Sequence, residues 1–488
     1  MRVNSFDVFD TLIARRCIEP GNIFLQIERK TGITHFAMAR RRAEASVASG
    51  NYTLDDIYKA LQQQSGLSTD QAEQLKQLEI AEEVDNAIPI TENLQRVRNG
   101  DLLISDMYLP PAVIRQMLDK CGLDKEVTLI VTSGGKSSGQ IWKHFDGKVE
   151  LDIHTGDNAH SDVQSPLSSG IFGRHTQLHS PSSYEKFLID NGLPRLGRLV
   201  RELRLKMLDA SRGMTTYKEM ELQIGINIPI LMMAATAIHH LAQTQQADRI
   251  LFCSRDCYYM FRIHQALFGG QPGSVPAAYF YTSRHARVKA SPAYLAYVRQ
   301  MVSDRSLVVD LCGTGWSLGE LYAKAGLQPM TMLMNYMPGS KMYDGMGERK
   351  PIDKIHFLNH DIDANNAILE ALNYTDHGMV EDVVHIDECN AFVPLLEDPH
   401  YPHGVLRYIH VIQETHRALM NLLPAHEPPA LQAEILSRKD LLPRLVEILS
   451  IDVKDKVHFL PDVAHYHVGQ DQKSMWRLQK LTQSSQVR

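Results

Sequence analysis

Four polar residues follow short, largely apolar runs of the sequence, and their chemistry suits phosphoryl transfer. They are Asp7 after VNSF, Ser105 at the end of LLIS, Lys136 after VTSGG, and Asp157 in HTGDNAHSD. An aspartate can attack phosphorus as a nucleophile when a cation offsets the charge of the incoming phosphate. A serine hydroxyl and a lysine ammonium can donate hydrogen bonds to the phosphoryl oxygens. Asp157, with Asp162 five residues later, adds carboxylate oxygens of the kind that Mg²⁺ prefers.

The segments between these residues predict the elements that position them. The strand patterns DLLISDMYL, VTLIVTS and LDIHTGD alternate with the helical patterns PPAVIRQMLDKCG and SSGQIWKHF. This alternation indicates a parallel α/β sheet. Such sheets bind ligands in the loops at the carboxyl ends of their strands, so we expect the polar residues to meet at one sheet edge.

Residues 20–95 have a different pattern, which predicts a helical insertion after the first strand. Their segments have the periodicity of amphipathic helices, and Thr53 and Ser68 precede acidic first turns as suitable N-cap residues. We therefore expect the insertion to cover one end of the sheet.

The motifs SFDVFDTLI, LLISD, GGKSSG and GDNAHSD, in this order, resemble the four motifs of the haloacid dehalogenase-like superfamily over residues 1–175. The resemblance implies a Rossmann-like core with an inserted cap, and Mg²⁺ as the cofactor. It implies that Asp7 is the nucleophile and that Ser105 and Lys136 bind the transferred group. Asp157 would hold Mg²⁺ together with Asp7, and Asp162 would support this metal site.

Position 9 departs from the pattern of most phosphatases in this superfamily. They have a second aspartate two residues after the nucleophile as general acid and base, whereas this chain has Phe9. Three interpretations remain open. In the first, Asp10, a substrate group or water replaces the missing acid in a phosphohydrolase. In the second, the reaction is another transfer through an aspartyl intermediate, and in the third the site binds a phosphorylated ligand without turnover. Asp10 is also explained as a loop residue that caps the next helix.

The second half of the chain again alternates strands and helices, and it contains two candidate anion-binding turns. Ile250–Cys253 predicts a strand that runs into a polar loop, and VVDLCGTGWSLGEL predicts a strand, a glycine-rich turn and a helix. Such turns offer backbone N–H groups to a phosphate. The residues expected to bind an anionic ligand are Arg255, Asp310, Gly313, Gly315 and Ser317.

These two turns loosely resemble the loops of phosphoribosyltransferases, although those enzymes have paired acidic residues where this chain has only Asp310. The layout of this half also resembles the second half of large bacterial proteins of the haloacid dehalogenase-like superfamily. A purely structural explanation stays open. Gly313 and Gly315 would then form only a tight turn, and Arg255 and Arg284 would only pair with neighbouring carboxylates.

The composition indicates a globular protein rather than a disordered chain or a nucleic-acid binder. Of the 488 residues, 44% are hydrophobic and 22% are charged, and the net charge is −6 without a long basic run. The six cysteines include one close pair, Cys253 and Cys257, so we expect reduced thiols. The most apolar stretch, Ile224–Ala242, has too short an uninterrupted run to span a bilayer. We expect a cytoplasmic protein without membrane or nucleic-acid partners.

These observations predict an α/β protein with two Rossmann-like domains. Residues 1–180 form the core with its cap over about residues 15–95, and residues 181–200 form a linker. Residues 201–385 form the second α/β domain, and residues 386–488 form a helical extension. The expected function is Mg²⁺-dependent hydrolysis of a sugar phosphate or nucleotide through an aspartyl-phosphate. The alternative is a bifunctional or sensing protein, whose second domain binds a phosphoribosyl or nucleotide-like ligand and whose first domain is partly degenerate.

Overall fold

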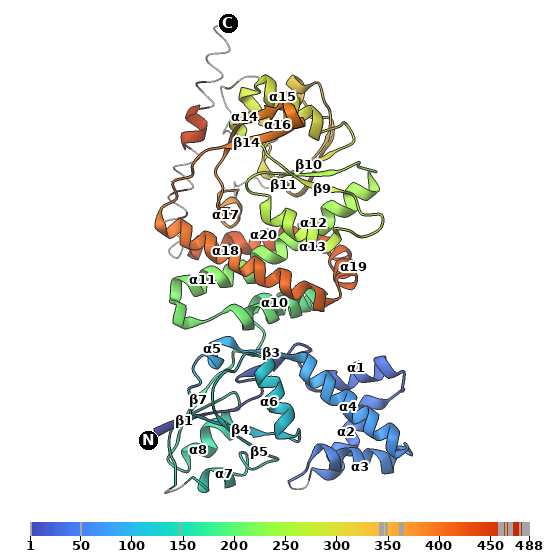
Figure 1. Cartoon of the computed structure of the whole chain (residues 1–488), viewed down its shortest axis with the longest axis vertical. Helices are drawn as coiled ribbons and strands as arrows, with labels where there is room; N and C mark the ends of the chain where they lie inside the picture. The colour runs from blue at the N-terminus through green and yellow to red at the C-terminus, as the bar shows by residue number, and fades with distance from the viewer. Residues whose placement is uncertain are drawn as a thin grey trace. The chain divides into compact units, whose positions relative to one another are not determined.

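The computed structural model divides the chain into two compact units (Figure 1). Unit 1 comprises Met1–Lys186 and Arg204–Ser211, and unit 2 comprises Phe187–Leu203 and Arg212–Arg488. The residues that the structure describes are 2–48, 51–145, 148–340, 346, 350–360, 366–456, 463, 466, 472–477 and 480.

Unit 1 is built on a five-stranded parallel sheet. Its strands are β1 (Arg2–Phe6), β4 (Leu102–Asp106), β5 (Thr128–Thr132), β6 (Glu150–Gly156) and β7 (Phe172–His175). Their order in the sheet is β5-β4-β1-β6-β7, and every neighbouring pair is parallel. The order of the strands therefore reverses between β1 and β6. This arrangement confirms the predicted parallel α/β fold.

Helices cover this sheet, and both of its faces are buried. The helices of the sheet layer are α5 (Thr91–Leu94), α6 (Pro111–Lys120), α7 (Gln140–Lys143) and α8 (Ser165–Leu167). Along β4, Leu103 packs into the same cluster as Phe6, whereas Leu102 and Ile104 pack with Trp142 in another cluster. Successive strand residues face opposite sides, so a strand covered on both faces is apolar at every position.

The predicted insertion folds as four helices, which Figure 1 shows grouped beside the sheet of unit 1. They are α1 (Gly21–Thr31), α2 (Phe36–Val47), α3 (Leu54–Ser65) and α4 (Thr69–Asn86). Thr53 and Ser68 form capping boxes at the start of α3 and α4, which confirms both predicted N-caps. The antiparallel strands β2 (Ile13–Arg15) and β3 (Ala87–Pro89) join the two ends of the insertion to the sheet layer.

Residues 181–200, which the sequence predicts as a linker, contain helical structure. They include α9 (Ser183–Asp190) and the first half of α10 (Pro194–Met207). Leu188 of α9, Leu193 between the helices, and Leu196 and Leu199 of α10 are all fully buried, so this segment packs an apolar side inward. Pro181 and Pro194 stand before or at the start of the helices, where proline is tolerated.

Unit 2 contains a second five-stranded parallel sheet. Its strands are β8 (Ile250–Cys253), β9 (Ala277–Phe280), β10 (Leu307–Gly313), β11 (Met330–Tyr336) and β12 (Ile355–His360). Their order is β12-β11-β10-β8-β9, and all neighbouring pairs are parallel. Figure 1 shows α12 (Ile228–Thr244) and α13 (Tyr258–Phe268) on one side of this sheet. The other side has α14 (Arg284–Lys289), α15 (Pro292–Met301) and α16 (Trp316–Ala325).

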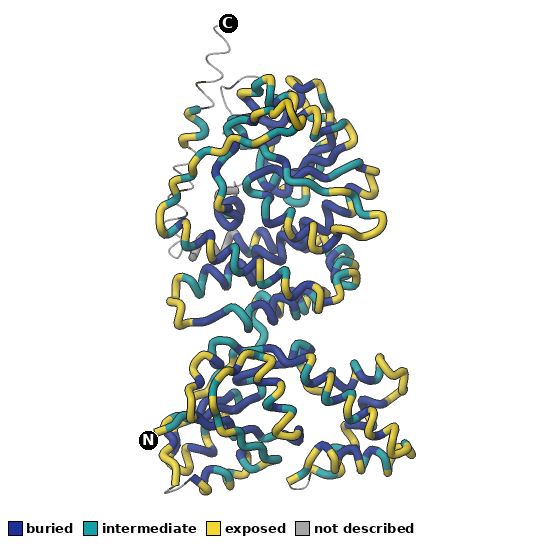
Figure 2. Tube along the Cα trace, in the orientation of Figure 1, coloured by how far each residue is buried: buried dark blue, intermediate teal, exposed yellow. Residues whose placement is uncertain are grey.

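The central helix of unit 2 is almost completely buried, as the blue tube in Figure 2 shows. It continues from α11 (Met214–Leu222) through a π-helical turn into α12. Met214–Thr244 is long and apolar enough to cross a membrane, but 89% of its most apolar window is buried inside the structure. Pro229 stands in the first turn of α12, as the sequence predicts.

The last part of unit 2 begins with a hairpin rather than with helices. Strand β13 (Val380–Ile386) pairs antiparallel with β14 (Ala391–Leu396), across the predicted start of the helical extension at residue 386. Both strands alternate residues of different exposure, which is the pattern of a two-stranded ribbon with one covered face. Further helices of this unit include α17 (Asn366–Ala371), α18 (His403–Leu422), α19 (Pro428–Ser437) and α20 (Leu442–Lys456).

Candidate active site

The four polar residues that the sequence singles out in unit 1 meet at the carboxyl edge of its sheet. Asp7 follows β1, Ser105 is the next-to-last residue of β4, Lys136 follows β5, and Asp157 follows β6. All four line one cavity of about 1110 Å³. The backbone N–H of Asp7 donates to Thr155 O over 2.8 Å, so β1 and β6 remain paired up to the site. The site lies where the strand order reverses, which is the usual ligand position in open α/β sheets.

Lys136 is the buried cation of this edge. Its Nζ lies 2.5 Å from Asp7 Oδ1 and 2.7 Å from Asp162 Oδ1, and the side chain is only 3% exposed. Burial alone would lower the pKa of Lys136, but the charges of Asp7 and Asp162 raise it. The ammonium is therefore protonated at neutral pH and partly neutralises the carboxylates around it.

A carboxylate that the sequence analysis did not single out fixes the loop of Lys136. Asp106, the last residue of β4, accepts the backbone N–H of Lys136 at 3.0 Å and that of Ser137 at 3.2 Å. Thr132 Oγ1 also donates to it, and Ser165 Oγ donates to the carbonyl oxygen of Lys136. The one signal in the sequence is that Asp106 directly follows Ser105.

A buried histidine contacts the same oxygen of Asp162 as Lys136 does. His154 Nε2 lies 3.2 Å from Asp162 Oδ1, and His154 Nδ1 lies 2.8 Å from Ser5 Oγ. Burial lowers the pKa of His154 to about 4, so the ring is neutral at pH 7. A neutral ring that donates from Nε2 to Asp162 accepts from Ser5 at Nδ1.

The pKa of Asp162 moves in the direction opposite to the effect of its burial. Burial would raise the pKa, but the hydrogen bond with His154 and the charge of Lys136 hold it well below its usual range. The backbone N–H of Asn158 also donates to Asp162 Oδ2 over 3.0 Å. Asp162 is thus an ionised carboxylate with both oxygens in use, which positions Lys136.

Three carboxylates converge closely enough to hold one cation. Ligand atoms of Asp7, Asp157 and Asp162 all lie within 4.8 Å of one another. Burial raises the pKa of Asp7 despite Lys136, and the charges of Asp162 and Asp157 raise it further. Burial, followed by the charges of Asp10 and Asp162, raises the pKa of Asp157 to about 6. An all-oxygen donor set of this kind could hold a hard cation such as Mg²⁺.

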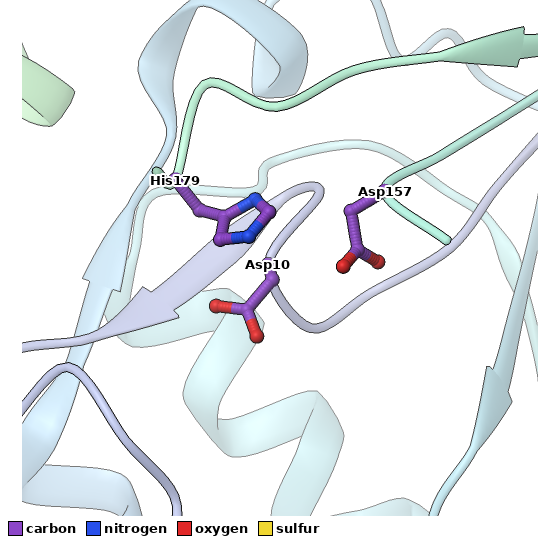
Figure 3. Close-up of side chains that lie close together, drawn as sticks. All are labelled: Asp10, Asp157 and His179. Carbon is purple, nitrogen blue, oxygen red and sulfur yellow. The ribbon is translucent and has the colours of Figure 1, made fainter. Parts of the chain in front are cut away.

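A second cluster adjoins Asp157 and includes a histidine that the sequence analysis missed. Ligand atoms of Asp10, Asp157 and His179 lie within 4.8 Å of one another. Figure 3 shows the His179 ring beside the Asp10 carboxylate, with Asp157 at the end of its strand. Asp10 has a φ of 57°, in the left-handed region that aspartate tolerates better than most residues. No sequence signal links His179 to Asp10, because the two lie 169 positions apart.

Phe9 lines the same cavity and contacts a paired arginine. The Arg15 guanidinium lies 4.5 Å from the centre of the Phe9 ring, and Arg15 Nε donates to Glu83 Oε2 over 2.8 Å. The insertion contributes Phe24, Glu44 and other side chains to the cavity lining. The position that lacks an aspartate is thus filled by an aromatic ring that faces the insertion.

The five residues predicted to bind an anion in unit 2 also come together. Arg255, Asp310, Gly313, Gly315 and Ser317 line a separate cavity of about 120 Å³. Arg255 and Arg284 also pair with neighbouring carboxylates, as the purely structural explanation of these residues expects, although both pairs are long. Arg255 Nε lies 3.6 Å from Asp256 Oδ1, and Arg284 Nη2 lies 3.7 Å from Glu370 Oε1.

Comparison with protein-family models finds no match to the chain, and neither does comparison with curated proteins.

Proposed function

We propose that unit 1 is a Mg²⁺-dependent phosphohydrolase that transfers the phosphoryl group of a small metabolite to Asp7 and then to water. The observation that carries this proposal is the placement of Asp7. Its carboxylate lies 2.5 Å from the buried Lys136 ammonium, within 4.8 Å of two further carboxylates, and on the wall of a large cavity. The resemblance of the four motifs to the haloacid dehalogenase-like superfamily supports the same reaction.

In this reaction Asp7 supplies the nucleophilic oxygen. Thr11 Oγ1 donates to Asp7 Oδ2 over 3.2 Å, so the carboxylate is oriented from its far side while Lys136 contacts Oδ1. A carboxylate oxygen forms a bond to phosphorus as the bond from phosphorus to the ester oxygen breaks. Water then attacks phosphorus, phosphate leaves, and the carboxylate is regenerated.

Lys136 and Ser105 hold the transferred group during both steps. The ammonium and the hydroxyl donate to phosphoryl oxygens, which gather charge in the transition state. Asp106 and Asp162 fix Lys136 from its backbone and from its side chain, so the donor does not need to reorganise. Mg²⁺, when bound by Asp7 and Asp157, supplies further positive charge against the phosphate and the carboxylates.

The departing oxygen needs a proton, and Phe9 cannot provide one. Asp10 faces the same cavity and lies beside His179, so we assign the acid and base role to Asp10, with His179 as its partner. General acid–base help of this kind is worth about 10²–10⁴-fold in rate. Binding without turnover, one of the other interpretations, becomes an outcome of the test below.

The substrate class follows from the cavity and from the helices α1–α4, which we interpret as the cap of this superfamily. The insertion lines the cavity with Glu44, Asn51 and Tyr52. Their polar side chains can form hydrogen bonds with the hydroxyl groups of a substrate. A hydroxyl-rich phosphate ester, such as a sugar phosphate or a nucleotide, fits such a lining.

A panel of sugar phosphates and nucleotides tests the proposal, with phosphate release measured with Mg²⁺ and Asp7→Asn as the blank. We expect the parent protein to hydrolyse at least one ester and the Asp7→Asn variant to hydrolyse none. Equal release by both proteins would remove Asp7 from the mechanism. Tight binding of an ester without release would support the non-catalytic interpretation instead.

A further inference from the structure

The small cavity of unit 2 lies at the point where the order of the strands in its sheet reverses. Strands β8 and β9 extend the sheet to one side, and β10, β11 and β12 extend it to the other. The loops after β8 and β10 therefore diverge and leave a crevice between them. The cavity of about 120 Å³ is lined by both of these loops and by the loop after β9. Ligands of open α/β sheets bind in this crevice.

The loop after β10 presents the start of a helix to this cavity. Gly315 is the N-cap of α16 and has a φ of 78°, a conformation that glycine adopts without strain. Having no side chain, Gly315 cannot accept the N–H groups of the first turn, and no side-chain cap is found at this helix. The backbone N–H groups of Ser317 and Leu318 thus have no acceptor from an N-cap side chain and suit an anion.

A buried arginine adds positive charge beside the same helix start. Arg287 is 4% exposed and lines the cavity. Its Nη1 donates to Asp310 Oδ2 at 2.9 Å and to Ser317 Oγ at 3.3 Å, and its Nε donates to Thr282 Oγ1 at 2.9 Å. These contacts fix the guanidinium against the first turn of α16. An anion there would meet a rigid cation as well as backbone N–H groups.

The loop after β8 completes the cavity with a second arginine and a carboxylate. The Arg255 guanidinium lies over the Tyr374 ring at 5.0 Å from its centre. Asp256 Oδ1 is buried and accepts no hydrogen bond among the described residues, since its arginine neighbour is 3.6 Å away. A buried carboxylate oxygen without a donor is costly, and a ligand hydroxyl would supply one. The helix that follows, α13, also begins without a side-chain cap.

We propose that this cavity binds a small phosphorylated polyol. The phosphate lies at the start of α16 beside Arg287 and Ser317, and a hydroxyl of the ligand donates to Asp256. Arg255 provides the second cation on the β8 side. This site is separate from the catalytic site proposed for unit 1, so either assignment can fail without the other.

Calorimetric titration of the full chain with ribose 5-phosphate and with inorganic phosphate tests the proposal, in EDTA so that turnover is suppressed. Ser317→Asp places a carboxylate at the start of α16, where it competes with the phosphate. The new carboxylate keeps a partner for Arg287 and suits the first turn of a helix, so the fold is expected to survive. Arg255→Gln tests the same cavity from the other loop. Lys218→Gln, on α11 and outside the cavity, is the matched control.

We expect ribose 5-phosphate to bind about tenfold or more weakly to Ser317→Asp and to Arg255→Gln, and unchanged to Lys218→Gln. Binding to Lys136→Gln, which changes the site of unit 1, should persist. Parent-like binding by both unit 2 variants, or binding lost only in Lys136→Gln, would overturn the proposal. Tighter binding of ribose 5-phosphate than of inorganic phosphate is expected from the contact to Asp256. Equal affinities would overturn the hydroxyl contact.

Discussion

The ammonium of Lys136 lies 2.5 Å from the carboxylate of Asp7, and both side chains are buried at the carboxyl edge of the first sheet. Lys136 also contacts Asp162, so one cation serves two carboxylates. The two carboxylates respond in opposite ways, because the pKa of Asp7 is raised and that of Asp162 is lowered. The ionised form is therefore stabilised at Asp162 and destabilised at Asp7, so a cation bound beside Asp7 would relieve the repulsion among the carboxylates.

The first prediction is that Asp7→Asn makes the metal-free protein more stable than the parent, by an amount that grows as the pH rises. A carboxyl whose pKa is raised by folding destabilises the folded protein as the pH rises from the ordinary pKa of about 3.9 to the raised value. Asn does not ionise, so the variant lacks this effect. The free energy of unfolding of the variant should therefore exceed that of the parent by more than about 1 kcal/mol at pH 8, and by much less at pH 4. Urea unfolding in EDTA across this range measures the difference.

Asp162→Asn is the matched control, because it should show the opposite trend. The pKa of Asp162 is lowered by folding, so its stabilising effect is present above about pH 4 and is lost as pH falls. We expect this variant to be less stable than the parent at pH 7, by about 3–5 kcal/mol, with a smaller difference in acid. The same pH trend in both variants would contradict the assignment of charge between the two carboxylates.

The second prediction concerns Mg²⁺ affinity and Asp157, whose pKa is raised to about 6. Metal binding requires the ionised carboxylate, so protons compete with Mg²⁺ below that pH. The apparent affinity should fall by at least tenfold for each pH unit below 6, since protonation of Asp7, whose pKa is also raised, adds to that of Asp157. Calorimetric titration with Mg²⁺ measures this without relying on activity.

Asp157→Asn should weaken Mg²⁺ binding and make it less dependent on pH, with the remaining dependence due to Asp7. Asp152→Asn changes an exposed carboxylate on the same strand and should bind Mg²⁺ like the parent. A parent affinity that does not vary from pH 5 to 8 would show that Asp157 is not a ligand.

Much of the first site could be predicted from the sequence, because its residues directly follow strands. Asp7, Ser105, Lys136 and Asp157 each stand after a short strand pattern, and parallel strands end at one edge of a sheet. The helical insertion could be predicted for a similar reason, since its periodicity and its N-caps are local signals. Periodicity and turn chemistry depend on residues a few positions apart, so the strands, the insertion and its N-caps can be predicted without knowledge of long-range contacts.

The supporting residues could not be predicted, because long-range contacts define their roles. His154 is a strand residue whose role appears only when Asp162 and Ser5 pack against its two nitrogens. His179 becomes a neighbour of Asp10 only after the whole sheet has formed. The helices within residues 181–200 cannot be predicted from the sequence, because the proline and glycine there indicate turns more strongly than the leucines indicate helices.

The third prediction is that a buried ion pair stabilises the insertion. Arg40 and Glu79 are both fully buried, and Arg40 donates to Glu79 at 2.7 and 2.8 Å. Arg40→Met leaves Glu79 without its cation and should cost about 3–5 kcal/mol in the free energy of unfolding. Arg115→Met, which breaks an exposed pair with Asp119, should cost less than about 1 kcal/mol. Similar losses in both variants would contradict the argument.

The last prediction is that Asp10 supplies the proton that Phe9 cannot. Asp10→Asn preserves the size of the side chain and tolerates the φ of 57°, so the loop should keep its conformation. Turnover of an alkyl phosphate should fall by about 10²-fold or more, because its leaving group needs a proton. Turnover of an aryl phosphate, whose leaving group departs without one, should fall far less. His179→Asn should show the same selectivity with a smaller loss, since His179 acts through Asp10. An equal loss for both substrates in Asp10→Asn would instead assign Asp10 to the structure of the loop or to the metal site.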